Sequence, residues 1–276
     1  MTEIETLKQL THPNIVRIHG TFELQDEYVL CMECMEMSLT RFYNVMHDVS
    51  GIFLDIFTTA IGYAIINALN FCKAMNIMHR DVKPDNILIN REGHIKLGDF
   101  GESRILKESL ALTFVGTLRY LPPERLTQSE DPEAPYDIRS DVWSLGMTLF
   151  ECMVGKYPVL GRDGEDITDV MKLPQLIKVE LIQQLLNNFI HSKSKDLLTG
   201  SQFLFRNYIK AFISQCFSDI KSRPKYKVLV ETLFYKNAEM TKEGMTYLMP
   251  DCVKCIINNN LEELKQCLID HLKYFQ

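Results

Sequence analysis

The sequence has no block of consecutive basic residues, and its 30 Lys and Arg residues are outnumbered by 36 Asp and Glu residues, giving a formal net charge of −6. A protein that binds nucleic acid needs a basic surface to contact the phosphate backbone. The composition therefore argues against nucleic acid as the main ligand. Any phosphate group must be bound locally.

Long apolar runs are also missing. The longest uncharged run, residues 56–72, contains four polar residues and is shorter than the roughly 20 apolar residues that a bilayer span needs. We expect it to be a buried core helix and expect no membrane partner. No signal peptide follows Met1 and no N-x-S/T sequon occurs, which predicts a cytoplasmic location, with the nucleus as the alternative.

In such a reducing compartment most of the eight cysteines are expected to be free thiols. Two C-x-x-C spacings nevertheless suggest zinc as an alternative. Cys31 and Cys34 lie in a strand-like run, where residues three apart point to opposite faces and cannot chelate one ion together. Cys252 and Cys255 lie in a predicted helix with Cys267 nearby, and this second zinc site stays open.

The most informative segment is a polar loop beside two strand-like runs, residues 87–89 and 94–97. The loop holds Asp81, Lys83 and Asn86, and Asp99 follows the second run. Phosphoryl transfer requires a group that positions a hydroxyl, hard oxygen ligands for magnesium, and positive charge near the moving phosphoryl group. These four residues meet those requirements.

The order H-R-D-V-K-P-D-N and then D-F-G resembles the catalytic and metal loops of eukaryotic protein kinases. The resemblance implies ATP and Mg²⁺ as cofactors. It implies that Asp81 orients the substrate hydroxyl and accepts its proton, that Lys83 steadies the phosphate, and that Asn86 and Asp99 bind magnesium. Arg80 would receive a phosphorylated activation segment. The alternative, a solvated hairpin, does not explain two motifs in order and at the family's spacing.

The resemblance also implies an adenine site. Met32 takes the gatekeeper position, and Glu33 and Met35 belong to the hinge whose backbone receives adenine. Glu3 matches a glutamate that pairs with a lysine on a preceding strand. Only two residues precede Glu3, and no G-x-G-x-x-G occurs. We therefore expect an N-terminally truncated kinase with impaired turnover and exposed apolar surface on an incomplete sheet.

The subgroup is indicated by Ser109 and Thr113, which reproduce the S-x-x-x-T activation-loop pattern of the mitogen-activated protein kinase kinases. This resemblance implies a MAP kinase as protein substrate and an upstream activating kinase that phosphorylates these two residues. Thr117 departs from the stress-activated branch of the group, which usually has cysteine at this position.

Three further residues have structural roles by the same resemblance. Glu124 of a P-P-E motif is expected to form a buried ion pair with Arg223, and Asp141 is expected to anchor the catalytic loop. Loss of one partner of a buried pair would cost about 3 to 5 kcal/mol.

The predicted fold class is α+β and protein-kinase-like, with an incomplete small β lobe and a mainly helical large lobe. Residues 1–36 form the small-lobe remnant, 37–237 the large lobe, and 238–276 a helical tail whose leucines at helical spacing dock on their own domain or, alternatively, on a partner. Strands are expected at 15–22 and 28–32, and helices at 38–48, 52–75, 171–199, 203–217 and 225–235.

Two functions fit these features. The first is transfer of the ATP γ-phosphate to serine or threonine, with tyrosine as a further acceptor, in a signalling cascade. The alternative is an impaired pseudokinase or truncated scaffold that binds kinase partners without turnover.

Overall fold

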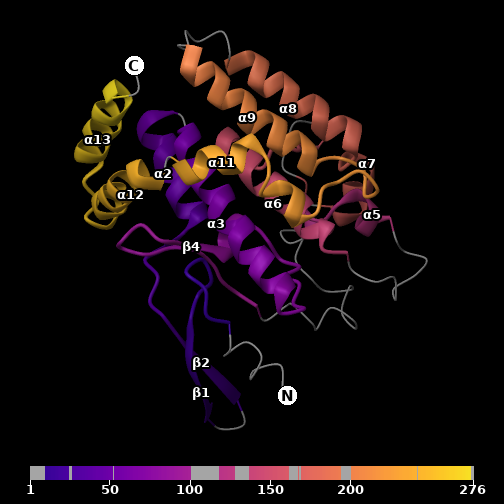
Figure 1. Ribbon diagram of the computed structural model, residues 1–276, viewed down its shortest axis with the longest axis horizontal. Coiled ribbons are helices and arrows are strands. Elements are labelled where there is room, and N and C mark those ends of the chain that lie inside the picture. The colour runs from indigo at the N-terminus through magenta and orange to yellow at the C-terminus, as the bar shows by residue number, and fades with distance from the viewer. Residues whose placement is uncertain are drawn as a thin grey trace.

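The computed structural model describes residues 10–24, 27–51, 53–100, 118–127, 137–161, 167, 169–193, 200–240 and 242–274. Within them, short strands come early in the chain and a mainly helical body follows (Figure 1). The predicted α+β class is confirmed.

The first sheet is an antiparallel hairpin of β1 (Ile18–Leu24) and β2 (Glu27–Met32), with a register irregularity between Ile18 and Gly20. It projects away from the helical body (Figure 1). Several of its large apolar side chains are exposed, namely Phe22, Leu24, Val29, Leu30 and Met32.

The second sheet has the order β3 (Met37–Ser38), β4 (Ile87–Ile89) and β5 (Ile95–Leu97), all antiparallel. Ile15 pairs in parallel with Leu97 of this sheet, and the N–H of Val16 donates to the carbonyl of Leu97 at 2.9 Å. The predicted strand at 15–22 is therefore wrong at its start. Burial of Ile15 and Val16 against the large lobe separates them from β1.

The next helix, α2 (Leu39–Ser50), shows why the local sequence is helical. Its four buried residues, Leu39, Phe42, Tyr43 and Met46, recur at helical spacing on one face. The Ser38 side chain accepts a hydrogen bond from the N–H of Arg41, and Gly51, with φ of 70°, ends the helix. The gap predicted between the helices at 38–48 and 52–75 is therefore confirmed and falls at Gly51.

Helix α3 (Asp55–Ala74) contains the longest uncharged run. Its length and composition would suffice for a membrane span, but 61% of its most apolar window is buried inside the protein. It packs against α6 (Arg139–Val154) and α11 (Leu233–Met240), and its core position confirms the predicted buried helix. The side chain of Arg206 pairs with Asp55 at its start, at 3.0 Å.

The remaining helical elements are η1 (Pro84–Asn86), α5 (Pro123–Leu126), η3 (Val170–Lys172), α7 (Leu173–Leu176), α8 (Val179–Lys193), α9 (Gly200–Cys216), α10 (Tyr226–Leu229), α12 (Lys242–Ile257) and α13 (Leu261–Tyr274).

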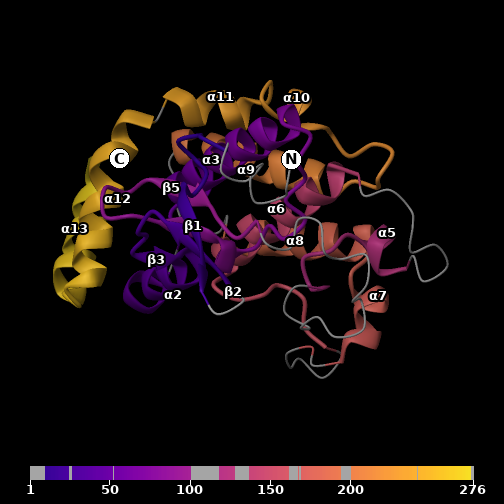
Figure 2. The same cartoon turned by 90° about the horizontal axis from the view of Figure 1, so that it is seen from below.

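The C-terminal tail is helical, as predicted. Helix α11 continues to Met240, and the tail consists of two helices, α12 and α13, that lie together on the side of α2 (Figure 2). Asn259 adopts a left-handed φ of 53° and separates them. Leu264 and Leu268 are buried against the chain's own helices, whereas Leu261 is exposed.

Candidate active site

The polar loop brings three predicted site residues into direct contact. Lys83 Nζ donates to Asp81 Oδ2 at 2.7 Å, and Asn86 Nδ2 donates to the same oxygen at 2.8 Å. Asn86 Nδ2 also donates to the backbone carbonyl of Asp81 at 2.9 Å. Asp81 and Asn86 are buried, so this carboxylate is oriented by fixed donors more than by solvent.

The hairpin of β4 and β5 brings Gly98, the residue before Asp99, to the backbone of this loop. The N–H of Gly98 donates to the carbonyl of Asn86 at 2.8 Å, so the residue after Gly98 begins beside the loop. A side chain at Gly98 would lie 3.2 Å from both Leu88 and Val16, which is tight for a packed site. Asp99 is exposed and has φ of 51°, an unfavourable conformation that the surrounding structure must stabilise.

Asp141 anchors the other end of the loop. Its two carboxylate oxygens accept from the N–H groups of Arg80 at 2.9 Å and His79 at 3.2 Å, across 61 and 62 residues of sequence. Burial raises the pKa of Asp141, and the nearby imidazole and the hydrogen bonds offset the rise only in part. These bonds hold Arg80 in its left-handed conformation, with φ of 71°.

His79 continues this support toward the metal loop. Its Nε2 lies 2.8 Å from the carbonyl oxygen of Gly98, and its ring meets that of Phe100 edge-on, with the centroids 4.7 Å apart. The catalytic-loop and D-F-G segments are therefore held to each other by one buried imidazole.

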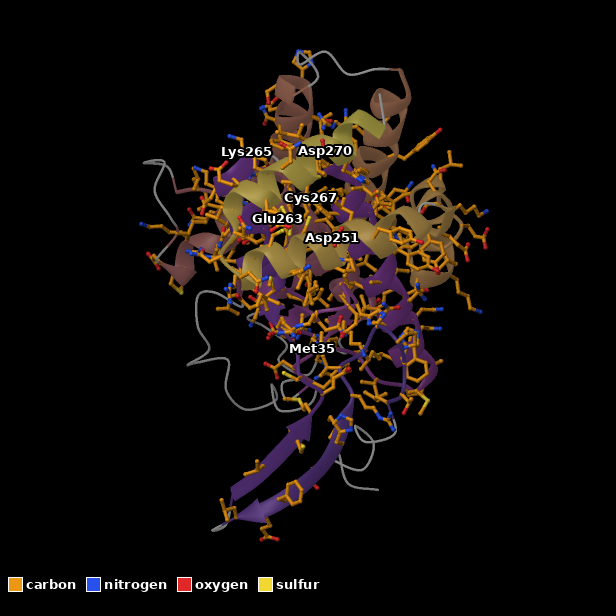
Figure 3. All side chains as sticks on the ribbon, turned by 90° about the vertical axis from the view of Figure 1, so that its left-hand side faces the viewer. Met35, Asp251, Glu263, Lys265, Cys267 and Asp270 are labelled. Carbon is orange, nitrogen blue, oxygen red and sulfur yellow. The ribbon has the colours of Figure 1, made fainter. Side chains whose placement is uncertain are left out.

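The predicted adenine hinge leaves the first sheet where β2 ends. The N–H of Glu33 donates to the carbonyl of Arg17 at 2.9 Å, which continues the hairpin pairing. Met35 lies where the hairpin meets the helical body (Figure 3). The Met32 side chain is half exposed.

The carboxylate of Glu33 links this hinge to β5. Lys96 Nζ donates to its two oxygens at 2.7 and 2.8 Å, and the N–H of Arg17 donates at 2.6 Å. Burial alone would raise the pKa of Glu33, but the bonds from Lys96 and Arg17 outweigh it and the pKa is lowered. The carboxylate is thus ionised and fixed at neutral pH.

Next to the site, residues 118–120 are fixed by a buried carboxylate that the sequence analysis missed. Glu151 accepts hydrogen bonds from the phenols of Tyr43 at 2.7 Å and Tyr120 at 2.5 Å. Burial raises the pKa of Glu151, and the two phenol bonds lower it only in part. The sequence did contain a signal for a buried carboxylate: Glu151 is the only charged residue within the sequence 142–155, and a single charge in such a segment needs a partner when it is buried.

The backbone of the same segment is held from two further directions. Tyr157 donates its hydroxyl proton to the carbonyl of Arg119 at 2.6 Å, and Ser144 Oγ donates to the carbonyl of Tyr120 at 2.9 Å. The Arg119 guanidinium lies 5.3 Å from the centroid of the Tyr157 ring and donates to the carbonyl of Ile167. Side chains from three positions therefore fix the segment 118–120.

The predicted pairing of Glu124 with Arg223 is present. Arg223 donates to both carboxylate oxygens, at 2.7 and 3.1 Å, and its guanidinium lies 4.9 Å from the centroid of the Trp143 ring. The Arg223 side chain is fully buried. The pair joins α5 to the turn after α9 and so braces the segment that follows residues 118–120.

Some predicted residues lie outside the described part of the chain, namely Glu3, Ser109 and Thr113. The zinc alternatives find no support in the described residues, where no group of three His, Cys, Asp or Glu side chains is arranged to hold a metal ion. Cys31 and Cys34 are exposed, while Cys252 and Cys255 are buried in α12.

Comparison with known proteins agrees with this geometry. The model of the protein kinase domain matches residues 1–235. The dual specificity mitogen-activated protein kinase kinase sek-1 of Caenorhabditis elegans is 33% identical over 234 residues, which cover 84% of this chain and 63% of sek-1.

Two further relatives come from the same organism. The dual specificity mitogen-activated protein kinase kinase mek-2 is 40% identical over 159 residues, covering 57% of this chain and 39% of mek-2. The MAP kinase kinase mkk-4 is 34% identical over 230 residues, covering 81% of this chain and 57% of mkk-4. The chain thus spans less than two thirds of the length of each relative. It belongs to the protein kinase family and is similar to its MAP kinase kinases.

Proposed function

We propose that the chain carries the machinery that transfers the ATP γ-phosphate to a serine or threonine hydroxyl, and also to tyrosine, of a MAP kinase. One observation carries the proposal: the buried carboxylate of Asp81 is held by Lys83 and Asn86 at hydrogen-bond distance. A carboxylate fixed in this way suits the positioning of an incoming hydroxyl and the acceptance of its proton.

The hydrogen-bond donors around Asp81 suggest a separate role for each loop residue. Lys83 carries its positive charge next to Asp81, where a transferred phosphoryl group would need neutralisation. Because Lys83 and Asn86 bind the same oxygen, Oδ2, the Asp81 side chain still has Oδ1 for the substrate hydroxyl. Asp141 acts through the backbone of His79 and Arg80 and is a positioning residue.

The residues present fit a magnesium ion. The amide nitrogen of Asn86 donates both of its hydrogen bonds to Asp81, so the amide oxygen is directed away from Asp81. Asp99 adds an exposed carboxylate from the adjoining segment. Amide and carboxylate oxygens are the ligands Mg²⁺ prefers, so Asn86 and Asp99 would hold the ion, and a bound ion would supply positive charge that neutralises the nucleotide phosphates.

The proposed partners follow from the family. The relatives are named as MAP kinase kinases, which supports a MAP kinase as the substrate and an upstream kinase as the activator. Ser109 and Thr113 are the proposed activating phosphorylation sites. The segment 118–120, which is fixed by hydrogen bonds to Glu151, Ser144 and Tyr157, is the proposed contact for the phosphate-accepting segment of the substrate.

The test measures transfer of labelled γ-phosphate from ATP and Mg²⁺ to a MAP kinase that has itself been inactivated. The Asp81→Asn variant should lose about 10²- to 10⁴-fold in rate, the usual contribution of a positioned acid or base. Asp48→Asn, an exposed carboxylate near the end of α2, is the matched control and should keep the rate of the parent chain.

Equal rates for the parent chain and Asp81→Asn would overturn the assignment of the base. A parent chain that binds the MAP kinase in a pull-down assay but transfers no phosphate would favour the second candidate, a scaffold that binds kinases without turnover.

A further inference from the structure

The carboxylate of Glu33 lies where three segments of the chain meet. Glu33 follows β2 in the hinge, Arg17 precedes β1, and Lys96 lies in β5. Lys96 Nζ donates to the two carboxylate oxygens at 2.7 and 2.8 Å, and the N–H of Arg17 donates to Oε1 at 2.6 Å. Only 21% of the Glu33 side chain and 14% of the Lys96 side chain are exposed, so this ion pair is largely shielded from solvent.

The hydrogen bond from Arg17 departs from the ordinary pattern of an antiparallel sheet. In a hydrogen-bonded pair, two opposed residues exchange both of their N–H to carbonyl bonds. The N–H of Glu33 donates to the carbonyl of Arg17 at 2.9 Å, which is one of the two. The N–H of Arg17 donates instead to the Glu33 side chain, so the return bond to the Glu33 carbonyl is replaced. In the part of the chain that the structure describes, no backbone N–H donates to that carbonyl.

Lys96 connects the same carboxylate to the strand that leads to the metal loop. Ile95 and Leu97 are buried, and Lys96 between them points to the opposite face of β5, as the alternation of a strand requires. The backbone of β5 is also bonded to the segment before β1. The N–H of Leu97 donates to the carbonyl of Asn14 at 2.9 Å, and Asn14 Nδ2 donates to the carbonyl of Ile95 at 3.0 Å. The hinge and the strand before Asp99 are therefore held to one framework.

We propose that Glu33 and Lys96 are positioning residues for the nucleotide base. The Glu33 carboxylate keeps the N–H of Arg17 away from the Glu33 carbonyl, and this carbonyl can then accept a hydrogen bond from the amino group of adenine. Lys96 fixes the carboxylate in the place where it does so. The inference rests on the proposed function, because it takes the hinge as the segment that receives the base of ATP. It adds a preference for a purine that carries an amino group.

Loss of the Glu33 side chain would leave the N–H of Arg17 in need of another acceptor. The carbonyl of residue 33 lies directly across in the antiparallel pairing and is the ordinary acceptor there. The base and Arg17 would then compete for one carbonyl. The expected effect on nucleotide binding is that of about one hydrogen bond, which corresponds to roughly 2- to 12-fold in Kd.

The experiment measures Kd for two nucleotides by isothermal titration calorimetry of the full chain in the presence of Mg²⁺. The nucleotides are ATP and purine riboside triphosphate, which is ATP without its amino group. The parent chain should bind ATP more tightly. Glu33→Ala should weaken ATP binding by about 2- to 12-fold and leave the binding of purine riboside triphosphate unchanged. A merely structural role of the side chain would weaken both nucleotides alike, so the ratio of the two Kd values separates the explanations.

Three further variants sharpen the test. Glu33→Gln keeps a side-chain oxygen that can accept from Arg17, so it should retain most of the preference for ATP. Lys96→Met keeps the carboxylate but removes its anchor on β5, and it should reduce the preference by a smaller factor than Glu33→Ala. Glu36→Ala is the matched control, because this nearby carboxylate pairs with the exposed Arg91 at 3.4 Å, and it should keep the preference of the parent chain. Circular dichroism checks that each variant is folded.

The inference is overturned if Glu33→Ala keeps the preference of the parent chain, or if it weakens the binding of both nucleotides by the same factor. An unchanged preference in Lys96→Met would overturn the role of Lys96. A parent chain that binds both nucleotides equally well also overturns the inference, but it leaves the proposed phosphate transfer standing. A parent chain that binds neither nucleotide contradicts the proposed function, and the inference falls with it.

Discussion

The guanidinium of Arg223 binds both oxygens of the Glu124 carboxylate, at 2.7 and 3.1 Å, although 99 residues separate them in sequence. Arg223 also donates to the carbonyls of Ser218 and Arg139. One buried side chain thereby connects α5, the start of α6 and the turn after α9. This is a structural connection, since it includes none of the residues that contact Asp81.

Removal of Glu124 should be costly for this reason. Glu124→Ala leaves a buried, uncompensated guanidinium, and we expect the free energy of unfolding to fall by about 3 to 5 kcal/mol. The exposed pair of Glu231 with Lys236 is the control, and Glu231→Ala should cost less than about 1 kcal/mol. Urea denaturation measures both. Similar losses in the two variants would contradict a special role for the buried pair.

Asp141→Asn tests the anchor of the catalytic loop. An amide has one acceptor oxygen where the carboxylate has two, so one of the N–H groups of His79 and Arg80 would lose its partner. We expect a loss of about 1 to 3 kcal/mol in unfolding free energy. The rate of phosphate transfer should fall as well, because Arg80 would no longer be held left-handed. Unchanged stability and rate would show that the anchor is dispensable.

Glu151 should make stability depend on pH. Because burial raises its pKa, the folded protein binds this proton more tightly than the unfolded chain does. Its contribution is therefore fully present below the unfolded pKa, near 4.5, and is lost as the pH rises through the folded pKa. Glu151→Gln cannot titrate, so its unfolding free energy should decline less over this range. Urea denaturation at a series of pH values measures the difference, and parallel curves would refute it.

Gly146→Ala tests the packing of α6 on α9. A side-chain carbon at Gly146 would lie 2.6 Å from Cys216 Cβ and 3.0 Å from the Phe217 ring. We expect overpacking to cost about 1 to 3 kcal/mol. Gly20→Ala is the control, because a side chain there would meet no atom within 4 Å. Thermal unfolding should show a lower Tm for Gly146→Ala only.

Much of the large lobe could be predicted because its signals are local. The spacing of Leu39, Phe42 and Met46 predicts α2, and Gly51 ends it where a left-handed residue is required. The prediction that the first strand begins at Ile15 was wrong, because β1 begins at Ile18. No local feature of the sequence around Ile15 indicates which of the two sheets it joins. Backbone pairing with Leu97 places it in the second sheet.

By itself, the order of residues determined the identity of the catalytic loop, its acidic, basic and amide members, and the pairing expected between Glu124 and Arg223. Only the tertiary structure decided that Glu33 binds Lys96 and that Glu151 accepts hydrogen bonds from two phenols. The physical reason is that the functional residues of the catalytic loop are close together in the sequence, so their order and spacing identify them. Side-chain partners on different elements are selected by the packing of helices and strands, which the local pattern does not encode.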